Sequence, residues 1–239
     1  MTHTLRAAWL VLDIEGTLMP TSAVHIGLYD FARPRLGPWI DEHPDSDLVR
    51  SAVARTRAEA GLPESATTAD VVAVLHRWMA EDRKAAPLKD LQGEIWRAGY
   101  ASGELVSEYF PDVVPALRAW HSAGLALAVF SSGSVTGQVA SFSNTTDGDL
   151  TPLFRHHFDT VNAGPKRAAP SYGVIRAKLG AAEPGSVLFL SDVSAELDAA
   201  ASDGWQTVGL ARPGEPFADA DFGDHLAVRS FDEIRVERA

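Results

Sequence analysis

The feature that most constrains the fold of this chain is a set of short apolar runs, most of which end at polar residues. The strongest are continuous patches and not period-two alternations, a pattern typical of strands buried on both faces of a sheet. The runs are Trp9–Leu12, Leu125–Phe130, Val187–Leu190 and Thr207–Leu210, with a weaker candidate at Phe158–Val161.

Segments with helical periodicity lie between the later apolar runs. After Pro111, the residues Val113, Leu117 and Trp120 line one face of a helix that Gly124 ends. Further helices are expected at Val135–Phe142, Ser171–Leu179 and Ala195–Ser202. Because strands alternate with helices, the sequence predicts an α/β fold with a doubly wound parallel sheet, that is, a Rossmann-like core.

A long stretch after the first strand shows helical patterns and no strand pattern. We therefore expect an α/β core domain of residues 1–19 and 111–239, with an all-helical domain of residues 20–110 inserted into it. Since the insertion leaves and re-enters the core beside the first strand's loop, we expect it to act as a cap that excludes water from a site. Its expected helices are Ser22–Gly37, ended by Pro34 and Pro38, then Asp47–Ala60, one capped by Thr68 or Asp70, and Leu88–Trp96.

Polar side chains follow three of the predicted strands and lie in one connecting loop. In an open parallel sheet, ligands bind outside the carboxyl ends of the strands, so these side chains are placed to meet at one site. Gly16, next to the first pair of carboxylates, allows close backbone approach there. The candidate site residues are Asp13 and Glu15 after the first strand, Ser131 and Ser132 after the second, Lys166 in a later loop, and Asp192 after the third.

Composition restricts what such a site can bind. The chain has no cysteine, so a metal must be held by oxygen or imidazole ligands, which favours a hard cation such as Mg²⁺. Its formal net charge of −11 is unlike the basic footprint of a nucleic-acid-binding protein. The sequence contains neither an apolar stretch of about 18 residues nor a secretory signal pattern, so no membrane association and a cytoplasmic location are expected.

The candidate residues have the chemistry that phosphoryl transfer requires. A carboxylate can attack phosphorus and form an aspartyl-phosphate. Hydroxyl donors, a lysine and a cation can stabilise the negative charge on the transferred group by electrostatics and positioning. The pattern therefore favours phosphoryl transfer through an aspartyl-phosphate.

Motifs along nearly the whole chain resemble known enzymes. In four ordered motifs it is similar to the haloacid dehalogenase-like phosphatases, and more closely it resembles the enolase-phosphatase (acireductone synthase) family of methionine salvage. The resemblance covers residues 10 to 214. Its motifs are Asp13-Ile14-Glu15-Gly16-Thr17, Pro87 to Trp96, Gly99 to Leu105, Phe130 to Val135, Thr146 to Leu150, Phe154 to Thr160, Ser171-Tyr172 and Leu188 to Val193.

The resemblance implies roles for the three acidic residues. It implies that Asp13, Glu15 and Asp192 bind one Mg²⁺ per chain, with Asp13 as the nucleophile and Glu15 as the general acid and base. From the sequence alone, Asp192 has an ordinary alternative role as the cap of the following helix. Glu196 is open between a partner of the metal ligands and a first-turn carboxylate that matches the helix dipole.

The resemblance also implies a substrate and the residues that hold it. Ser131, Ser132 and Lys166 would bind 2,3-diketo-5-methylthiopentyl-1-phosphate, which the family enolises and dephosphorylates to the acireductone. The expected partner is thus a small phosphorylated diketone, and we expect a monomer. Two alternatives remain at this point: a haloacid dehalogenase-like small-molecule phosphatase without enolase activity, and a non-enzymatic binding module that kept the fold.

Overall fold

The helical insertion and the rest of the chain form separate units in the computed structural model, which describes residues 2–239 apart from the side chains of Val24, His25 and Ile26. One unit is the contiguous segment Ser22–Val106. The other combines the chain up to Thr21 with Ser107–Ala239. The first residues of the chain therefore pack with its second half.

A six-stranded sheet forms the centre of the second unit, in the order β4-β3-β2-β5-β6-β7. All of its neighbouring strands pair in parallel. This arrangement confirms the predicted doubly wound α/β core. The strands are β2 (Trp9–Leu12), β3 (Ala126–Phe130), β4 (Phe154–Phe158), β5 (Val187–Ser191), β6 (Gln206–Leu210) and β7 (Leu226–Val228).

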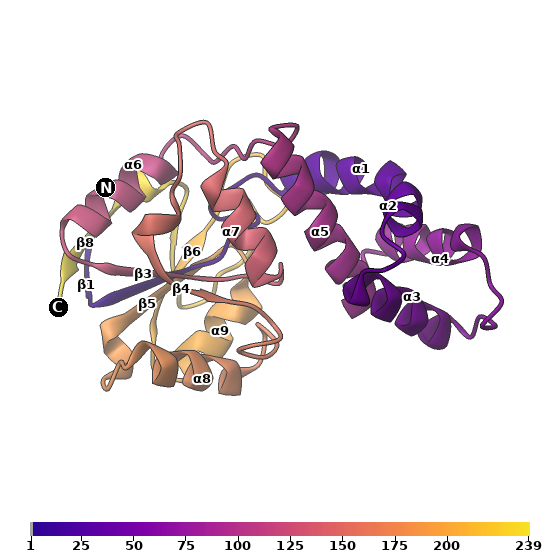
Figure 1. The fold of residues 1–239 in the computed structure, drawn as a ribbon. Helices are drawn as coiled ribbons and strands as arrows, with labels where there is room; N and C mark the ends of the chain where they lie inside the picture. Colours follow the sequence, from indigo (N-terminus) through magenta and orange to yellow (C-terminus); the bar gives the residue numbers. More distant parts are fainter. Residues whose placement is uncertain (1) are drawn as a thin grey trace. The chain divides into compact units, whose positions relative to one another are not determined.

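Helices cover both faces of this sheet. Figure 1 shows α6 and α7 on one face, and α8 and α9 on the other. With helices on both sides, the middle strands have no solvent-facing side, and every residue of β3 and β5 is buried. The helices are α6 (Val113–Ser122), α7 (Val135–Ser143), α8 (Ala169–Leu179) and α9 (Ser194–Ser202), with short 3-10 turns η3 (Thr151–Leu153), η4 (Pro184–Ser186) and η5 (Phe231–Glu233).

Aromatic side chains fill the core between β5 and the helices α8 and α9. Tyr172 packs edge-on against Phe130, Phe189 and Trp205, with ring centroids 5.6, 5.3 and 5.3 Å away. Edge-to-face packing suits the charge distribution of aromatic rings and stabilises such pairs beyond their buried area. The sheet that carries the candidate site residues therefore rests on a rigid aromatic layer.

Strand β4 lies earlier in the sequence than predicted. The weak pattern indicated Phe158–Val161, whereas the strand is Phe154–Phe158, and its pairing with β3 shifts register between Leu127 and Ala128. Polar residues inside this edge strand hide its periodicity. At its end, the Asp159 carboxylate accepts the N–H groups of Val161 and Asn162 and so turns the chain.

A second, two-stranded sheet was not predicted. It pairs β1 (His3–Ala7) in parallel with β8 (Ile234–Arg238). Strand β1 is mostly exposed and β8 alternates apolar with charged residues, so neither shows the continuous apolar run that marks a strand buried on both faces. Strand β7 was missed because it is only three residues long.

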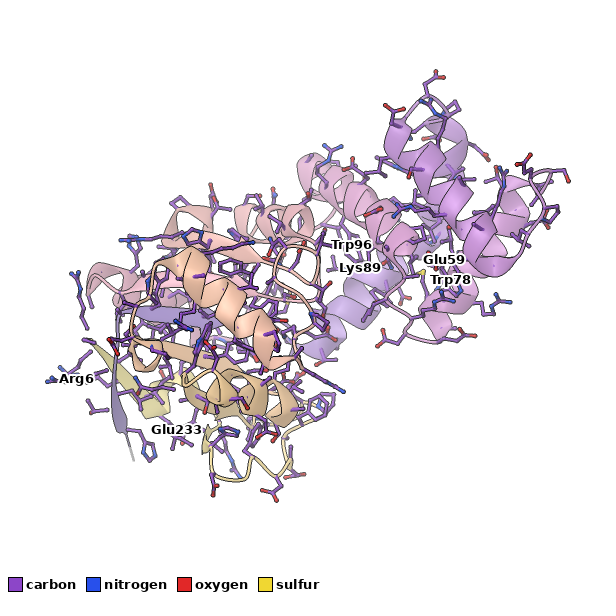
Figure 2. All side chains as sticks on the ribbon, turned by 90° about the horizontal axis from the view of Figure 1, so that it is seen from below. Arg6, Glu59, Trp78, Lys89, Trp96 and Glu233 are labelled. Carbon is purple, nitrogen blue, oxygen red and sulfur yellow. The ribbon has the colours of Figure 1, made fainter. Side chains whose placement is uncertain are left out.

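The unit Ser22–Val106 is helical throughout its regular structure. Its core includes Trp78, which is 1% exposed, and the partly buried Trp96 packs against that core. Figure 2 labels both side chains among these helices. The elements are a π-helical turn η1 (Ala23–Leu28), α1 (Tyr29–Ala32), a 3-10 turn η2 (Arg33–Arg35), α2 (Leu36–Glu42), α3 (Asp47–Ala60), α4 (Thr68–Ala80) and α5 (Ala86–Ser102).

Two prolines do not end the first helical segment, contrary to the prediction. Pro34 lies in η2, and Pro38 lies in the first turn of α2, which runs on to Glu42. A first-turn residue has no intrahelical acceptor for its N–H, so proline is tolerated there. Helices α3 and α4 start at typical caps, the first with the Ser46 hydroxyl accepting the Val49 N–H. The cap of α4 is Thr67, which forms a capping box with Asp70, and not Thr68 or Asp70 as predicted.

No helix in the described part of the chain has the length and apolar character needed to cross a membrane.

We expect the aromatic layer to dominate the stability of the α/β unit. Replacing the fully buried Phe189 with alanine should lower the free energy of unfolding by about 3–5 kcal/mol, because it leaves a cavity beneath the sheet. Phe217 is 41% exposed, so Phe217→Ala is the matched control and should have a small effect. Urea unfolding followed by tryptophan fluorescence measures both, and equal losses in the two variants would contradict this picture.

Candidate active site

The candidate site lies where the direction of the chain through the sheet reverses. Strand β2 has β3 on one side and β5 on the other, and Leu12 pairs with Val129 and Leu190. Asp13 therefore emerges between the ends of two neighbouring strands. This is the topological switch point at which open parallel sheets bind ligands.

Asp13 is held in place by its own loop. It is 4% exposed, its N–H donates to the Leu190 carbonyl at 3.0 Å, and its Oδ1 accepts the Ile14 N–H at 2.8 Å. Oδ2 has a longer contact, with the Ser191 hydroxyl at 3.4 Å. One carboxylate oxygen is thus fixed while the other is more weakly engaged.

Lys166 meets Asp13 inside the protein. Its Nζ lies 2.5 Å from Asp13 Oδ1 and 2.7 Å from Glu196 Oε2, and the lysine is 8% exposed. Burial alone would lower the pKa of Lys166, but the charges of Asp13 and Glu196 outweigh it and raise that pKa. The lysine is therefore a buried, permanently charged ammonium.

The backbone around Lys166 is fixed by α8, the helix that follows it. The Tyr172 hydroxyl donates to the Lys166 carbonyl at 2.7 Å, and the Ser171 hydroxyl donates to the Pro165 carbonyl at 2.8 Å. Because Tyr172 also belongs to the aromatic layer, the position of the ammonium is coupled to the core.

Asp192 follows β5 on the opposite side of β2 from Ser131. Its N–H donates to the Thr17 hydroxyl at 3.0 Å, while its Oδ1 is buried and has no hydrogen-bond partner among the described residues. Burial, and after it the charge of Asp13, raises the pKa of Asp192 to about 8. The Asp192 carboxylate therefore has too little positive charge around it to compensate its burial.

Gly16 lies against this carboxylate. A Cβ placed on Gly16 would be 2.0 Å from Asp192 Oδ2, and the glycine has a φ of +72°. Both facts require glycine here, one for space and one for conformation. The Asp13–Thr17 loop and the turn at Asp192 can pack closely only because this side chain is absent.

The donor set fits a divalent cation. Three carboxylates, of Asp13, Asp192 and Glu196, are buried around the single ammonium of Lys166, so the cluster has an excess of negative charge. The unpartnered Asp192 Oδ1 is a hard oxygen ligand that suits Mg²⁺. As the side chains stand, no group of three or more His, Cys, Asp or Glu residues within the described part of the chain is arranged as a metal site.

Ser131 and Ser132 follow β3, beside Asp13. Ser131 is buried, with its N–H donating to the Phe158 carbonyl at 3.1 Å and its Oγ accepting the Gly133 N–H at 3.2 Å. Among the described residues no hydrogen bond joins either serine to Asp13 or Lys166. The cap of α7 is Ser134, which accepts the Gly137 N–H. Ser131 and Ser132 do not cap this helix.

Glu15 lies in the Asp13 loop and is half-buried. In the next turn the Gly16 N–H donates to the Met19 carbonyl at 2.8 Å. The structure thus places all the predicted site residues on loops at the carboxyl end of the sheet or leading into α8. It brings Asp13 and Lys166 into direct contact.

Two residues of this cluster were not assigned from the sequence. Glu196 in the first turn of α9 forms an ion pair with Lys166, a partner that neither of the alternatives considered for it named. Ser191 donates its hydroxyl to Glu196 Oε2 at 2.9 Å. The only sequence signal for Glu196 was its place one turn after Asp192, which does not reveal its partner.

Comparison with known proteins decides the family. The chain is 68% identical over 237 residues to the enolase-phosphatase E1 of Saccharopolyspora erythraea, covering 99% of each chain. This chain belongs to the enolase-phosphatase E1 family. The family assignment confirms the resemblance found in the motifs, and the chain is accordingly an enzyme. No protein-family model matches the sequence.

Solved structures share the enolase-phosphatase chain's fold. The UTR4 protein of Saccharomyces cerevisiae is 28% identical and has a TM-score of 0.76, with 95% of this chain and 99% of that chain covered. The HAD-hydrolase YfnB of Bacillus subtilis is 13% identical and has a TM-score of 0.56, with coverage of 95% and 96%. The second likeness concerns the fold alone and confirms the haloacid dehalogenase-like architecture.

We expect Gly16→Ala to disable the site. The new methyl group would displace Asp192, and a shift of about 1 Å in a catalytic group can cost about 100-fold in rate. Gly148 has a φ of +88°, and a Cβ added to it would have nothing within 4 Å, so Gly148→Ala imposes the backbone strain without the collision. Phosphate release should fall steeply in the first variant only. Equal losses in both would show that strain, and not contact with Asp192, is responsible.

Proposed function

We propose that this chain converts 2,3-diketo-5-methylthiopentyl-1-phosphate, through its enol, to 1,2-dihydroxy-3-keto-5-methylthiopentene and phosphate in methionine salvage. The observation that carries the phosphatase half is Asp13, buried at the end of an interior strand with one oxygen held by Lys166. The enolase half and the substrate are supported by the relative of 68% identity that is named enolase-phosphatase E1.

Asp13 is the proposed nucleophile. Its Oδ1 accepts from both Ile14 and Lys166, which leaves Oδ2 as the less engaged oxygen for attack on phosphorus. The new bond from Asp13 to phosphorus forms as the bond from phosphorus to the substrate oxygen breaks, which gives an aspartyl-phosphate. Water then attacks that phosphorus, releases phosphate and restores the Asp13 carboxylate.

Charge stabilisation is the proposed task of Lys166, Ser131 and Ser132. The Lys166 ammonium, already charged and fixed by Glu196, needs no reorganisation when negative charge builds up on the phosphoryl oxygens. The two serines precede α7, whose N-terminal end favours an anion. Together these groups orient the phosphate of the substrate towards Asp13.

Glu15 is the proposed general acid and base. It follows Asp13 by two residues in the same loop, and its side chain is one methylene longer than that of aspartate, so it reaches a different point. In the first step it would donate a proton to the leaving oxygen. In the second it would take a proton from the attacking water.

One Mg²⁺ per chain is the proposed cofactor, held by Asp13, Glu15 and Asp192. The support is the excess of buried carboxylates and the unpartnered Asp192 oxygen. When bound, such an ion supplies Lewis acidity that favours enolisation of a carbonyl and shields the phosphate charge. The residues of the chain supply the nucleophile, the proton transfers and the orientation.

Asp13→Asn tests the proposed reaction directly. With the diketone phosphate and Mg²⁺, the unsubstituted protein should show enol absorbance and phosphate release in one cuvette. Losing the nucleophile should lower the rate of phosphate release by about 1,000-fold or more. Asp219→Asn, at an exposed position of the same unit, is the control and should keep the full rate.

Two outcomes would contradict the proposal. Full phosphate release by Asp13→Asn would remove Asp13 as the nucleophile. Hydrolysis of simple phosphate esters without enol formation from the diketone phosphate would instead favour a small-molecule phosphatase of the same fold.

The proposed metal site predicts stabilisation by Mg²⁺. After dialysis against EDTA the activity should be lost, and added Mg²⁺ should raise the thermal midpoint, because an ion at 100 times its Kd stabilises the folded state by about 2.7 kcal/mol. Asp192→Asn should abolish the rise, and Asp219→Asn should retain it. A Mg²⁺-dependent rise of the same size in Asp192→Asn would show that the ion binds elsewhere.

A further inference from the structure

Arg212 is a buried charge that the proposed reaction does not use. It follows β6 by two residues and is 3% exposed. Its guanidinium lies over the rings of Phe110 and Phe231, 4.2 and 4.9 Å from their centroids. A cation held this tightly inside the protein needs specific partners.

Two partners lie in different directions from this guanidinium. Nε donates to the Thr17 carbonyl at 2.6 Å, and Nη1 donates to both carboxylate oxygens of Asp112 at 2.9 and 3.1 Å. The planar guanidinium fixes the angle between these bonds. Arg212 thus joins the catalytic loop to the start of α6.

Thr17 connects Arg212 to the candidate active site. Its carbonyl accepts from Arg212, and its hydroxyl accepts the N–H of Asp192 at 3.0 Å. Thr17 also lies in the same tight loop as Asp13, and its N–H donates to the Ile14 carbonyl at 3.2 Å. A single residue therefore links Arg212 to the loops that carry both site aspartates.

Asp112 anchors one end of the Arg212 guanidinium. Its carboxylate also accepts the Phe231 N–H at 2.6 Å and the Ser230 hydroxyl at 3.1 Å. Burial raises the pKa of Asp112, but the bonds from Arg212 and Phe231 outweigh it and keep the pKa low, so the pair is ionised. Arg212 is anchored at this end and reaches Thr17 at the other.

The loop that carries Arg212 holds the same segment at a second point. Glu215 Oε2 accepts the Thr21 N–H at 2.8 Å. Arg212 and Glu215 therefore bind the two ends of the segment 17–21. This segment follows the proposed nucleophile Asp13 and the proposed general acid and base Glu15.

We propose that Arg212 is a positioning residue for the reaction: through Thr17 it fixes the Asp13 loop and the Asp192 turn in the alignment that phosphoryl transfer requires. The inference rests on the proposed function, and it assigns Arg212 no contact with substrate. Arginine makes the two bonds from two separate nitrogens of one planar group, Nε and Nη1, whereas a lysine that stays with Asp112 has all its donors on a single nitrogen at that position.

Arg212→Lys tests this inference, and its thermal midpoint shows whether the variant is folded. The variant keeps the charge beside Asp112 and loses the Thr17 bond. We expect its thermal midpoint to stay close to that of the unsubstituted protein. Its single-turnover rate of phosphate release from the diketone phosphate, with enzyme in excess and saturating, should fall about tenfold or more. That rate constant does not depend on the fraction of enzyme that is folded.

Arg176→Lys is the matched control. Arg176 in α8 forms an ion pair with Asp203 at 2.8 Å within the same unit, away from the catalytic loop. It should keep the single-turnover rate. If the unsubstituted protein and Arg176→Lys turn over but Arg212→Lys is equally fast, the positioning role is wrong. If the unsubstituted protein does not turn over the diketone phosphate, it is the proposed function that fails.

A second pair of variants tests the contact between Thr17 and Asp192, on which the proposed role of Arg212 depends, if Arg212→Lys does not fold. Thr17→Ser retains the hydroxyl that accepts from Asp192, whereas Thr17→Val removes it. Loss of the single-turnover rate in Thr17→Val and its retention in Thr17→Ser would support the chain of contacts. Equal rates in the two would overturn it.

Discussion

The ion pair between Lys166 and Asp13 is the interaction on which the rest of the site depends. Both groups are buried, and removal of one partner from a buried pair costs about 3–5 kcal/mol because the other charge is left without compensation. Glu196 adds a second carboxylate to the same ammonium. The arrangement holds two carboxylates and one ammonium together, from the end of β2, the loop before α8 and the first turn of α9, in a place from which water is largely excluded.

The buried core positions these charges. Tyr172 bonds the Lys166 carbonyl and packs against Phe189 and Trp205. The aromatic layer therefore fixes the position of Lys166 relative to the sheet. On the other side of Asp13, Thr17 joins the loop to Asp192. Two independent supports thus meet at one carboxylate, which is what preorganisation of a charged site requires.

Local patterns in the sequence were sufficient for the buried strands and for the residues at their ends. Asp13 and Asp192 each follow an apolar run, and parallel pairing alone brings such positions together. Strands β1 and β8 carry no continuous apolar run, and the Lys166–Glu196 pair depends on two distant segments meeting. Arg212 is the extreme case, because a single arginine after a strand shows nothing of its partners until the chain is folded.

The parallel pairing of β2 with β3 and β5 has a consequence for biosynthesis. Residues Ser22–Val106 are contiguous, so that unit can acquire its contacts while the ribosome is still adding the residues behind it. Strand β2 emerges earlier but finds β3 only after the whole insertion and β5 later still. Asp13, the proposed nucleophile, is thus among the first residues made and among the last to reach its native surroundings, and during that interval its apolar strand is unpaired.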